Sequence, residues 1–243
     1  MPFLRRSLKG WPLFLLIALA AALAAAAIDP ALIKARNRQD LKALDAIIAQ
    51  AKQNAAANPK SAAAQYKLAL ADSYAAQVAQ ELRDKKRSAA YAEAGIDPAR
   101  TAVSLEDGNA EYHRLYGQLC GQVIPGNPLL GALKYGHCAR DEIETAIKLN
   151  DKSALAYLSR GIGNYYLPAA MGGGVDLALK DIDHAIALDP KLGEAYLWKG
   201  IALRKAGKDN EARAALERAL QLNPDRLWTK QELAKIPVQN SSH

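Results

Sequence analysis

The chain has 243 residues, of which 50% are apolar and only 6% aromatic, and its formal net charge is +7. This length can bury a real core, but the positive excess is too small and too scattered to indicate a nucleic-acid-binding protein. Alanine, leucine, lysine, glutamate and glutamine outnumber the β-branched residues, and they lose the least entropy in a helix. The composition therefore predicts an all-α fold.

Residues 1–28 have the pattern of an export signal or a membrane anchor, and we set them apart from the folded domain. Three cations precede an uncharged run of 18 residues, Trp11–Ile28, and small residues end that run at Ala24–Ala27. Such an end suits cleavage by signal peptidase, while 18 apolar residues also just reach the length of a membrane-spanning helix. Cleavage and an uncleaved anchor both stay open. Either one predicts a periplasmic chain, or one anchored in the inner membrane and facing the periplasm.

The rest of the chain is predicted to be an N-terminal helix at residues 29–60, a repeat domain at 61–236 and a disordered tail at 237–243. The N-terminal helix is amphipathic, with one apolar face formed by Leu41, Leu44, Ile48 and Ala51. Two basic runs, Arg36–Arg38 and Arg83–Arg87, are interpreted as solvated helix surface and not as a phosphate-binding patch.

The first helix pair of the repeat domain is its least regular part. It runs through Tyr66 and Leu70 to Ala102 and Leu105. The sequence "GIDP", Gly95–Pro98, predicts a break or kink within the second helix of this pair, because proline removes a backbone donor and clashes with the preceding turn.

Three further helix pairs repeat one pattern of small and large residues. The last pair, Gly193–Pro224, shows it most clearly, with Tyr196, Gly200 and Leu203 before the turn "AGKDNE" and Ala212, Leu216 and Ala219 after it. Ala219 lies 34 residues after Ala185, its counterpart in the preceding pair. Small residues let paired helices approach, and large ones fill the gaps between layers. The pattern therefore predicts stacked antiparallel pairs.

The two pairs before the last contain insertions at the turn between their helices. From Gly200 to Ala212 there are 12 positions, whereas the corresponding separation is 17 in the pair of Gly161 and 22 in the pair of Gly117. The extra residues lie around "LPAAMGGG" and "IPGNPLLG". Proline ends the first helix and glycines permit an extended loop, so we expect two loops at the same end of the stack.

This residue set resembles the tetratricopeptide repeat (TPR) over most of Ala62–Ile236. The resemblance implies a TPR-type α-solenoid, which is a right-handed superhelix of antiparallel helix pairs, with about four repeats. The segment "LWTKQELAKI" after Pro224 is then a capping helix that covers the last repeat. Proline followed by paired glycines inside a repeat is also similar to exported bacterial TPR proteins, some of them associated with periplasmic transporters, and to the mitochondrial microtubule-dynamics regulators.

The resemblance further implies a binding groove on the inner wall, formed by the first helix of each repeat. That wall would present Lys67, Tyr74, Arg114, Gln118, Leu158, Ile162, Tyr165, Tyr166, Leu197, Ile201, Arg204 and Lys205. Aromatic surface beside cations suits an extended peptide or a helix of acidic character. Tyr165 and Tyr166 could instead pack the inserted loop, and this alternative stays open.

The two cysteines of the chain, Cys120 and Cys138, form no CxxC motif and have no histidines at metal-binding spacing, which argues against zinc. Cys120 ends the first helix of a repeat and Cys138 begins its antiparallel partner. We therefore predict a disulfide between them, with two buried free thiols as the alternative.

No catalytic motif occurs in the sequence, because the histidines are dispersed and the glycine groups follow no strand. His113 is expected to pack in an aromatic position of its repeat. We expect no enzyme, no metal and no cofactor, but a scaffold that binds a protein partner, and a membrane through residues 11–28 if these are retained. The alternative is a solute-handling accessory of a periplasmic transporter, with loops at Pro125 and Pro168 around a small-molecule pocket.

Overall fold

The computed structural model describes residues 28–237, which contain α-helices and two short 3-10 helices but no strand. The α-helices are α2 (Pro30–Asn37), α3 (Leu41–Ala57), α4 (Ala62–Glu81), α5 (Lys85–Leu105), α6 (Ala110–Val123), α7 (Pro128–Leu149), α8 (Ala154–Tyr166), α9 (Val175–Leu188), α10 (Gly193–Lys205), α11 (Asp209–Leu222) and α12 (Leu227–Ala234). The all-α prediction is confirmed. The leader predicted before Ile28 and the tail after Pro237 lie outside the described residues. Within 28–237, no helix has the length and apolarity needed to cross a membrane.

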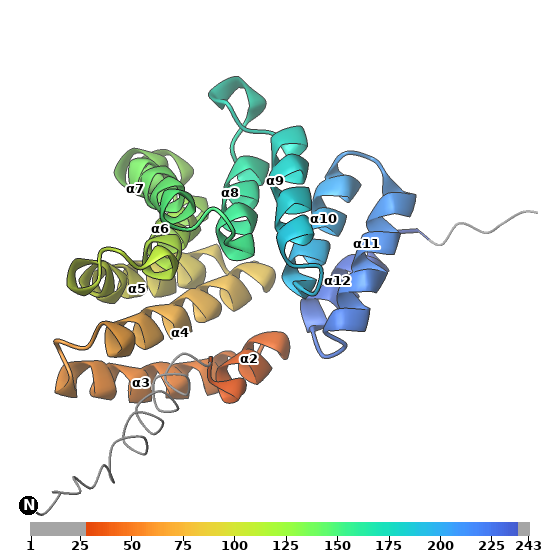
Figure 1. Cartoon of the computed structure of the whole chain (residues 1–243). Helices are drawn as coiled ribbons and strands as arrows, with labels where there is room; N and C mark the ends of the chain where they lie inside the picture. Colours follow the sequence, from red (N-terminus) through yellow and green to blue (C-terminus); the bar gives the residue numbers. More distant parts are fainter. Residues whose placement is uncertain (1–27, 238–243) are drawn as a thin grey trace, which may run out of the picture.

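The helices pack as four antiparallel pairs, α4 with α5, α6 with α7, α8 with α9 and α10 with α11, as the repeat pattern predicts. The first helices of successive pairs also contact one another, so α4, α6, α8 and α10 form an inner layer. Figure 1 shows the pairs following one another along an arc, with α12 packed on the last pair as the predicted capping helix. The structure is a TPR-type α-solenoid.

Glycines make the close approach inside each regular pair possible. A Cβ atom on Gly117 or Gly161 would lie 2.9 Å from Cγ1 of Ile143 or Ile182, and one on Gly200 would lie 2.5 Å from Cγ of Leu216. Because such distances are too short for a real methyl group, these positions hold glycine and the large partner fills the space.

The solenoid has two main hydrophobic cores, one in each half, besides a small cluster of Ala62, Ala102 and Tyr112. The N-terminal core is formed mainly by α2 to α6 and includes Leu44, Leu115 and Leu119. The C-terminal core is formed by α8 to α12 and includes Ile182 and Leu216. Each core is a separate cluster of buried apolar side chains, so the contacts between the two halves of the molecule are mostly of another kind.

One prediction about helix boundaries is wrong, and another is wrong in one of its two alternatives. Residues 29–60 form two helices and not one, because the chain turns at Gln39, which has a φ of 55°, and Asp40 then caps α3. Of the break or kink expected at "GIDP", the break does not occur, since α5 continues through Pro98. Ile96 and Ala99 on either side of Pro98 are buried in the N-terminal core, and this packing holds the helix together despite the missing donor.

The two insertions take different forms. Residues 167–174 make the extended loop that was predicted, with Gly172 and Gly174 at φ values of 85° and 112° that favour glycine, and Figure 1 shows this loop projecting beyond α8 and α9. The larger insertion is instead largely helical: Ile124–Gly126 form a 3-10 turn and α7 already begins at Pro128. Cys120 of α6 and Cys138 of α7 are joined in a disulfide, with their Cα atoms 6.0 Å apart.

Candidate functional site

Four aromatic side chains gather where α8, α10 and α12 meet, and we call them the inner cluster: Tyr165, Tyr166, Trp198 and Trp228. The ring centroids of Tyr165 and Tyr166 lie 5.7 and 6.1 Å from that of Trp198, and Trp198 lies 5.3 Å from Trp228. All of these contacts are edge to face, the arrangement that aromatic quadrupoles favour. Trp198 is buried, whereas Tyr166 is 50% exposed. The cluster thus presents one tyrosine to the surface and supports it from behind.

Two cations lie beside the inner cluster. Lys205 is exposed, and its Nζ lies 4.2 Å from the ring centroid of Tyr165 and donates a hydrogen bond of 2.9 Å to the carbonyl of that residue. Arg204 is paired at 3.0 Å with the buried carboxylate of Glu232, which also accepts a hydrogen bond from the indole of Trp228. Lys205 is therefore the more accessible positive charge at this surface.

The other residues of the predicted wall do not form one open groove. Leu158, Leu197 and Ile201 are buried in the C-terminal core, and Arg114 is buried against Glu111. They are not available to a partner in this structure. The physical reason is that the inner helices of successive repeats contact one another, so side chains that point inward meet a neighbouring helix.

The remaining wall residues lie apart from the inner cluster or on its edge. Lys67 is exposed on α4, and the ring of Tyr74 is covered by the guanidinium of Arg36, whose Cζ lies 4.8 Å from the ring centroid. Gln118 donates a hydrogen bond of 2.9 Å to Ser73, and Ile162 packs against the C-terminal core. The structure therefore brings together Tyr165, Tyr166, Arg204 and Lys205 from the predicted set.

Four charged side chains that sequence reasoning missed join the two ends of the superhelix, and we call them the clasp: Arg36, Glu81, Glu194 and Arg226. Arg226 donates to Glu194 through Nε at 2.8 Å and to Glu81 through both terminal nitrogens, one of them at 3.0 Å. Arg36 pairs with Glu194 at 3.1 Å. The side chains of Arg226 and Glu81 are each only 1% exposed, so their charges are balanced almost entirely by one another and by Glu194.

The clasp keeps one carboxylate firmly ionised. Burial alone would raise the pKa of Glu194, but the positive charges of Arg226 and Arg36, with the hydrogen bonds that it accepts, lower it to about 2. Burial raises the pKa of Glu81, and Arg226 opposes that rise. Glu194 is therefore the permanent counter-charge of Arg226.

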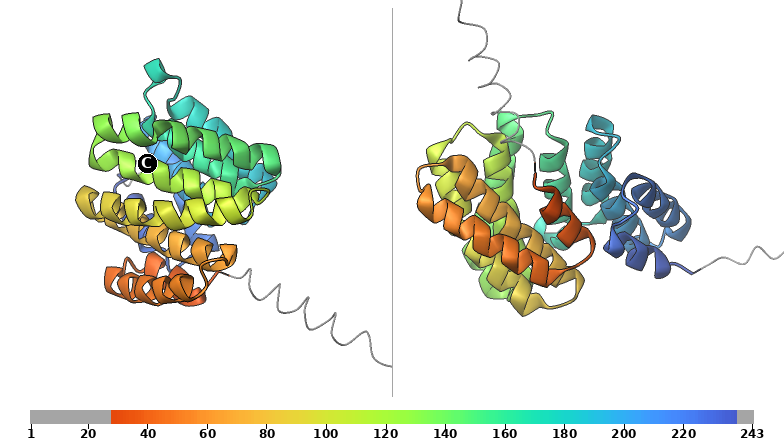
Figure 2. Two further views of the ribbon diagram at one scale, coloured as in Figure 1. Left: turned by 90° about the vertical axis from the view of Figure 1, so that its left-hand side faces the viewer. Right: turned by 90° about the horizontal axis from the view of Figure 1, so that it is seen from below.

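Helix α2 brings Arg36 to this place. Figures 1 and 2 show α2 between the α3–α4 hairpin and the C-terminal helices. Beside the clasp, Asn37 donates to Asn223 and Gln39 donates to Gln231, both at 3.1 Å. The interpretation of Arg36–Arg38 as solvated surface is wrong for Arg36, which is only 8% exposed. Asp29 followed by Pro30, a typical helix start, is the sequence signal that could have located α2.

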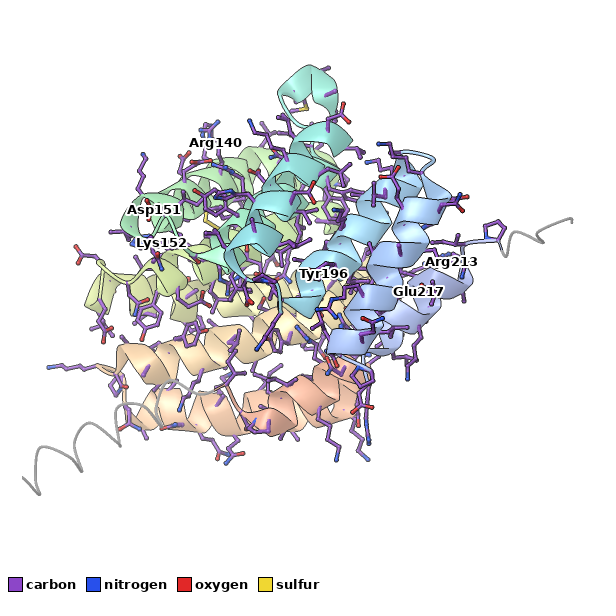
Figure 3. All side chains as sticks on the ribbon, turned by 45° about the vertical axis from the view of Figure 1, so that its right-hand side comes forward. Arg140, Asp151, Lys152, Tyr196, Arg213 and Glu217 are labelled. Carbon is purple, nitrogen blue, oxygen red and sulfur yellow. A yellow bond between two sulfur atoms is a disulfide. The ribbon has the colours of Figure 1, made fainter. Side chains whose placement is uncertain are left out.

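Two hollows in the described part of the chain lie away from the predicted loops. These shallow hollows, of about 330 and 620 Å³, are lined respectively by residues such as Tyr196 and Arg218 and by residues such as Glu106 and Asn150. Neither is lined by the loops at Pro125 or Pro168. Figure 3 labels Tyr196 on α10, on the part of the surface that contains the first hollow. The geometry gives no support to the solute-binding alternative.

His113 is buried and has polar partners at both ring nitrogens. Nδ1 lies 2.6 Å from a carboxylate oxygen of Glu142, and Nε2 lies 2.7 Å from the carbonyl oxygen of Asp107. These contacts join α6 to α7 and to the turn before α6. His113 thus has a structural place within its repeat, as expected, although it is held by hydrogen bonds as well as by packing.

Comparison with known proteins gives two family matches. Residues 30–168, from α2 into the loop after α8, match the sequence model of "Regulator of microtubule dynamics protein 1-3". Residues 193–226, which are α10, α11 and the turn before α12, match the tetratricopeptide repeat. The second match confirms the repeat where the small and large residues are most regular.

Individual relatives agree with these matches. Regulator of microtubule dynamics protein 3 of Bos taurus is 26% identical over 65% of this chain and 36% of its own length. The small glutamine-rich tetratricopeptide repeat-containing protein 2 of Mycosarcoma maydis is 32% identical over 48% of this chain and 32% of its own length. The chain thus spans about a third of the length of these relatives.

Among solved structures, a thermophilic TPR protein of Thermus thermophilus aligns over 81% of this chain and 91% of its own, with a TM-score of 0.60 and 19% identity. At this identity the likeness shows the fold alone. The family match, in contrast, spans more than half of the chain and includes the clasp residues Arg36 and Glu81. The chain therefore belongs to the family of the regulators of microtubule dynamics 1-3, and a tetratricopeptide repeat follows the matched region.

Proposed function

We propose that this TPR-type protein is a non-enzymatic scaffold that binds a segment of a protein partner on the inner cluster. The observation that carries the proposal is Tyr166, a half-exposed aromatic side chain that rests on the buried Trp198. A ring that is already held in place loses little further entropy on binding, and such aromatic residues often dominate the energy of an interface.

The charge beside Tyr166 favours an acidic partner. Lys205 is exposed and donates a hydrogen bond to the carbonyl of Tyr165, so its positive charge stays over the ring of Tyr165. The centroid of that ring lies 5.1 Å from that of Tyr166. A segment with an apolar side chain for the aromatic surface and a carboxylate for Lys205 would satisfy both groups. Complementary charge of this kind chiefly improves specificity and the rate of association.

The leader supports a proposal about location. A basic start, the uncharged run and the small residues before Asp29 favour an exported chain, either released in the periplasm or anchored in the inner membrane. An oxidising compartment would also suit the disulfide of Cys120 and Cys138. The intact mass of protein from the native host tests this: a mass without the leader means cleavage, and a full-length mass in washed membranes means an anchor. A full-length chain with free thiols in the cytosol would contradict export.

The binding proposal is tested by selecting peptides from a displayed library on the full chain and titrating the enriched peptides against variants. Tyr166→Ala and Lys205→Glu should each weaken binding at least about tenfold, a loss of about 1.4 kcal/mol or more. Tyr166→Phe keeps the ring and should bind nearly as well as the parent. Lys152→Glu is the matched charge control, since Lys152 is exposed in the turn before α8, at the end of that helix away from Tyr166. Peptides whose binding ignores Tyr166 and Lys205 would contradict the proposed site.

A further inference from the structure

We propose that the last turn of α4 covers part of this docking surface as an intramolecular ligand, and that the partner segment is an acidic helix end that displaces it. In the free protein, the side chains of Gln80 and Glu81 occupy the positions that the partner's side chains take when it binds. This inference rests on the proposed function, because it concerns the partner and the regulation of the same surface.

The last turn of α4 contacts the residues that frame the inner cluster. Gln80 donates a hydrogen bond of 2.7 Å to the hydroxyl of Tyr166. Its neighbour Glu81 accepts hydrogen bonds from both terminal nitrogens of Arg226. The Cζ atom of Arg226 in turn lies 5.5 Å from the ring centroid of Trp228. Two adjacent residues of one helix end thus engage the exposed tyrosine and the arginine beside the second tryptophan.

The contacts that Gln80 and Glu81 make are polar, as in a reversible interface, and not apolar, as in a hydrophobic core. Ala75, Val78 and Ala79 of the same helix are buried in the N-terminal half of the molecule. The side chains of Gln80 and Glu81, by comparison, cross to the C-terminal half through hydrogen bonds and ion pairs. Interfaces that separate and re-form are more polar than permanent ones. The junction is therefore the part of the solenoid best suited to open.

The clasp can release Glu81 without leaving Arg226 unbalanced. Glu194 stays ionised and holds Nε of Arg226 at 2.8 Å, and both residues belong to the C-terminal half of the molecule. Nη1 and Nη2 of Arg226 face Glu81, and two parallel N–H groups bind any carboxylate in the same geometry. A glutamate from another helix can thus replace Glu81, and a glutamine before it can replace Gln80 at Tyr166.

The first experiment uses the α4 end itself as the probe. A labelled synthetic peptide of residues 71–83, "ADSYAAQVAQELR", is titrated into the full chain and into its Glu81→Gln variant. A closed junction that leaves about one molecule in ten open lowers the apparent affinity about tenfold. We therefore expect the variant to bind the peptide about tenfold more tightly than the parent. The same peptide with glutamine at the position of Glu81 should bind neither protein, and Glu217→Gln on the exposed face of α11 should behave as the parent.

The second experiment locks the junction shut. Gln39→Cys and Gln231→Cys replace two side chains that touch across it, and a short bis-maleimide joins them. Cys120 and Cys138 are bonded to each other and do not compete for the reagent. The locked protein should lose binding of the α4 peptide and of library peptides that depend on Tyr166. The same double variant capped with N-ethylmaleimide should keep it.

The outcomes separate this inference from the proposed function. Equal binding of Tyr166-dependent peptides by parent, Glu81→Gln and locked protein would overturn the intramolecular ligand and leave the docking surface intact. Loss of all Tyr166 dependence, in contrast, would overturn the docking surface. If Glu81→Gln fails to fold, the locked protein and Gln80→Ala, which removes only the contact with Tyr166, decide between the same two results.

Discussion

The two halves of the solenoid are stabilised in different ways. In the N-terminal half, every helix from α2 to α7 begins after a Ser, Asp or Asn whose side chain accepts a hydrogen bond from the first turn. In the C-terminal half, α8 has such a cap in Ser153, whereas α9 to α12 have none. The N-terminal half also contains the disulfide. The C-terminal half relies on regular packing of small against large residues. Polar caps and the disulfide thus stabilise the irregular repeats individually, while packing between adjacent helices stabilises the regular repeats.

One position, compared across three repeats, shows the same trend. Glu142 in α7 contacts His113, and Asp181 in α9 accepts two hydrogen bonds from Arg160. In α11 the equivalent residue is Ala215, which lines the hollow of about 330 Å³. The polar contact between paired helices therefore disappears toward the regular end of the solenoid, and close packing takes its place.

The largest effect is expected where packing alone holds a pair. A side chain at position 200 would lie against Leu216 Cγ, so Gly200→Val should reduce the free energy of unfolding by about 3 kcal/mol or more. Urea denaturation measures the loss. Gly163→Ala in α8 is the control, because no atom lies within 4 Å of the added methyl group and alanine should stabilise the helix by about 1 kcal/mol. Similar stabilities for the two variants would show that close packing is not what holds the C-terminal half.

The disulfide should contribute nearly as much in the other half. Replacing Cys120 and Cys138 together by serine opens a loop of sequence separation 18, and the chain-entropy model gives a loss of about 3 kcal/mol. Hydrogen exchange should increase in α6 and α7 more than in α10 and α11. Thiol titration of the parent in denaturant without reductant is the direct check, and two reactive thiols per chain would rule out the bridge.

Much of the fold could be predicted because its signals are local. The small residues Gly117, Gly161 and Gly200, the helix period, and Pro190 and Pro224 after the last two pairs locate the repeats, the insertions and the capping helix. The clasp could not be predicted in the same way, since Glu81 and Arg226 are 145 residues apart and meet only because of how tightly the superhelix winds. The same winding buries Leu197 and Ile201, which a general TPR wall would expose.

Each half of the molecule contains a buried aspartate, Asp72 in the N-terminal half and Asp181 in the C-terminal half. Asp72 in the N-terminal half is only 3% exposed, and burial raises its pKa from 3.8 to about 7, with Lys52 opposing that rise. The folded chain then holds a proton that the unfolded chain has lost, so stability falls as the pH rises from about 4 to 7 and stays lower above that range. Asp72→Asn should therefore stabilise the protein by about 2 kcal/mol at pH 8, with no gain near pH 4.

Asp181 in the C-terminal half is the matched control for Asp72. It is also buried, but its carboxylate accepts hydrogen bonds from Arg160 and Asn164. Asp181→Asn removes one of the two carboxylates that pair with Arg160, leaving Glu144 at 3.2 Å, and should destabilise the protein at neutral pH. Thermal melts of both variants between pH 4 and 8 test the contrast. A shift of the same sign for both would mean that the partners of Asp181, Arg160 and Asn164, do not set it apart from Asp72.

The smallest effect on stability is expected at the inner cluster. Tyr166→Ala removes a half-exposed ring and its hydrogen bond with Gln80, so we expect a loss of only about 1 kcal/mol. Binding of a selected acidic peptide should fall at least about tenfold, because the same ring is the proposed anchor. Tyr165→Ala should lower the free energy of unfolding more than Tyr166→Ala does and should weaken peptide binding less. The reason is that Tyr165 packs between Trp198 and Lys205, so that its loss loosens the cluster. Urea denaturation and peptide titration on the two single variants separate the roles. If Tyr166→Ala costs about 3 kcal/mol and binding falls only as the fold is lost, the tyrosine is part of the core and the docking surface must lie elsewhere.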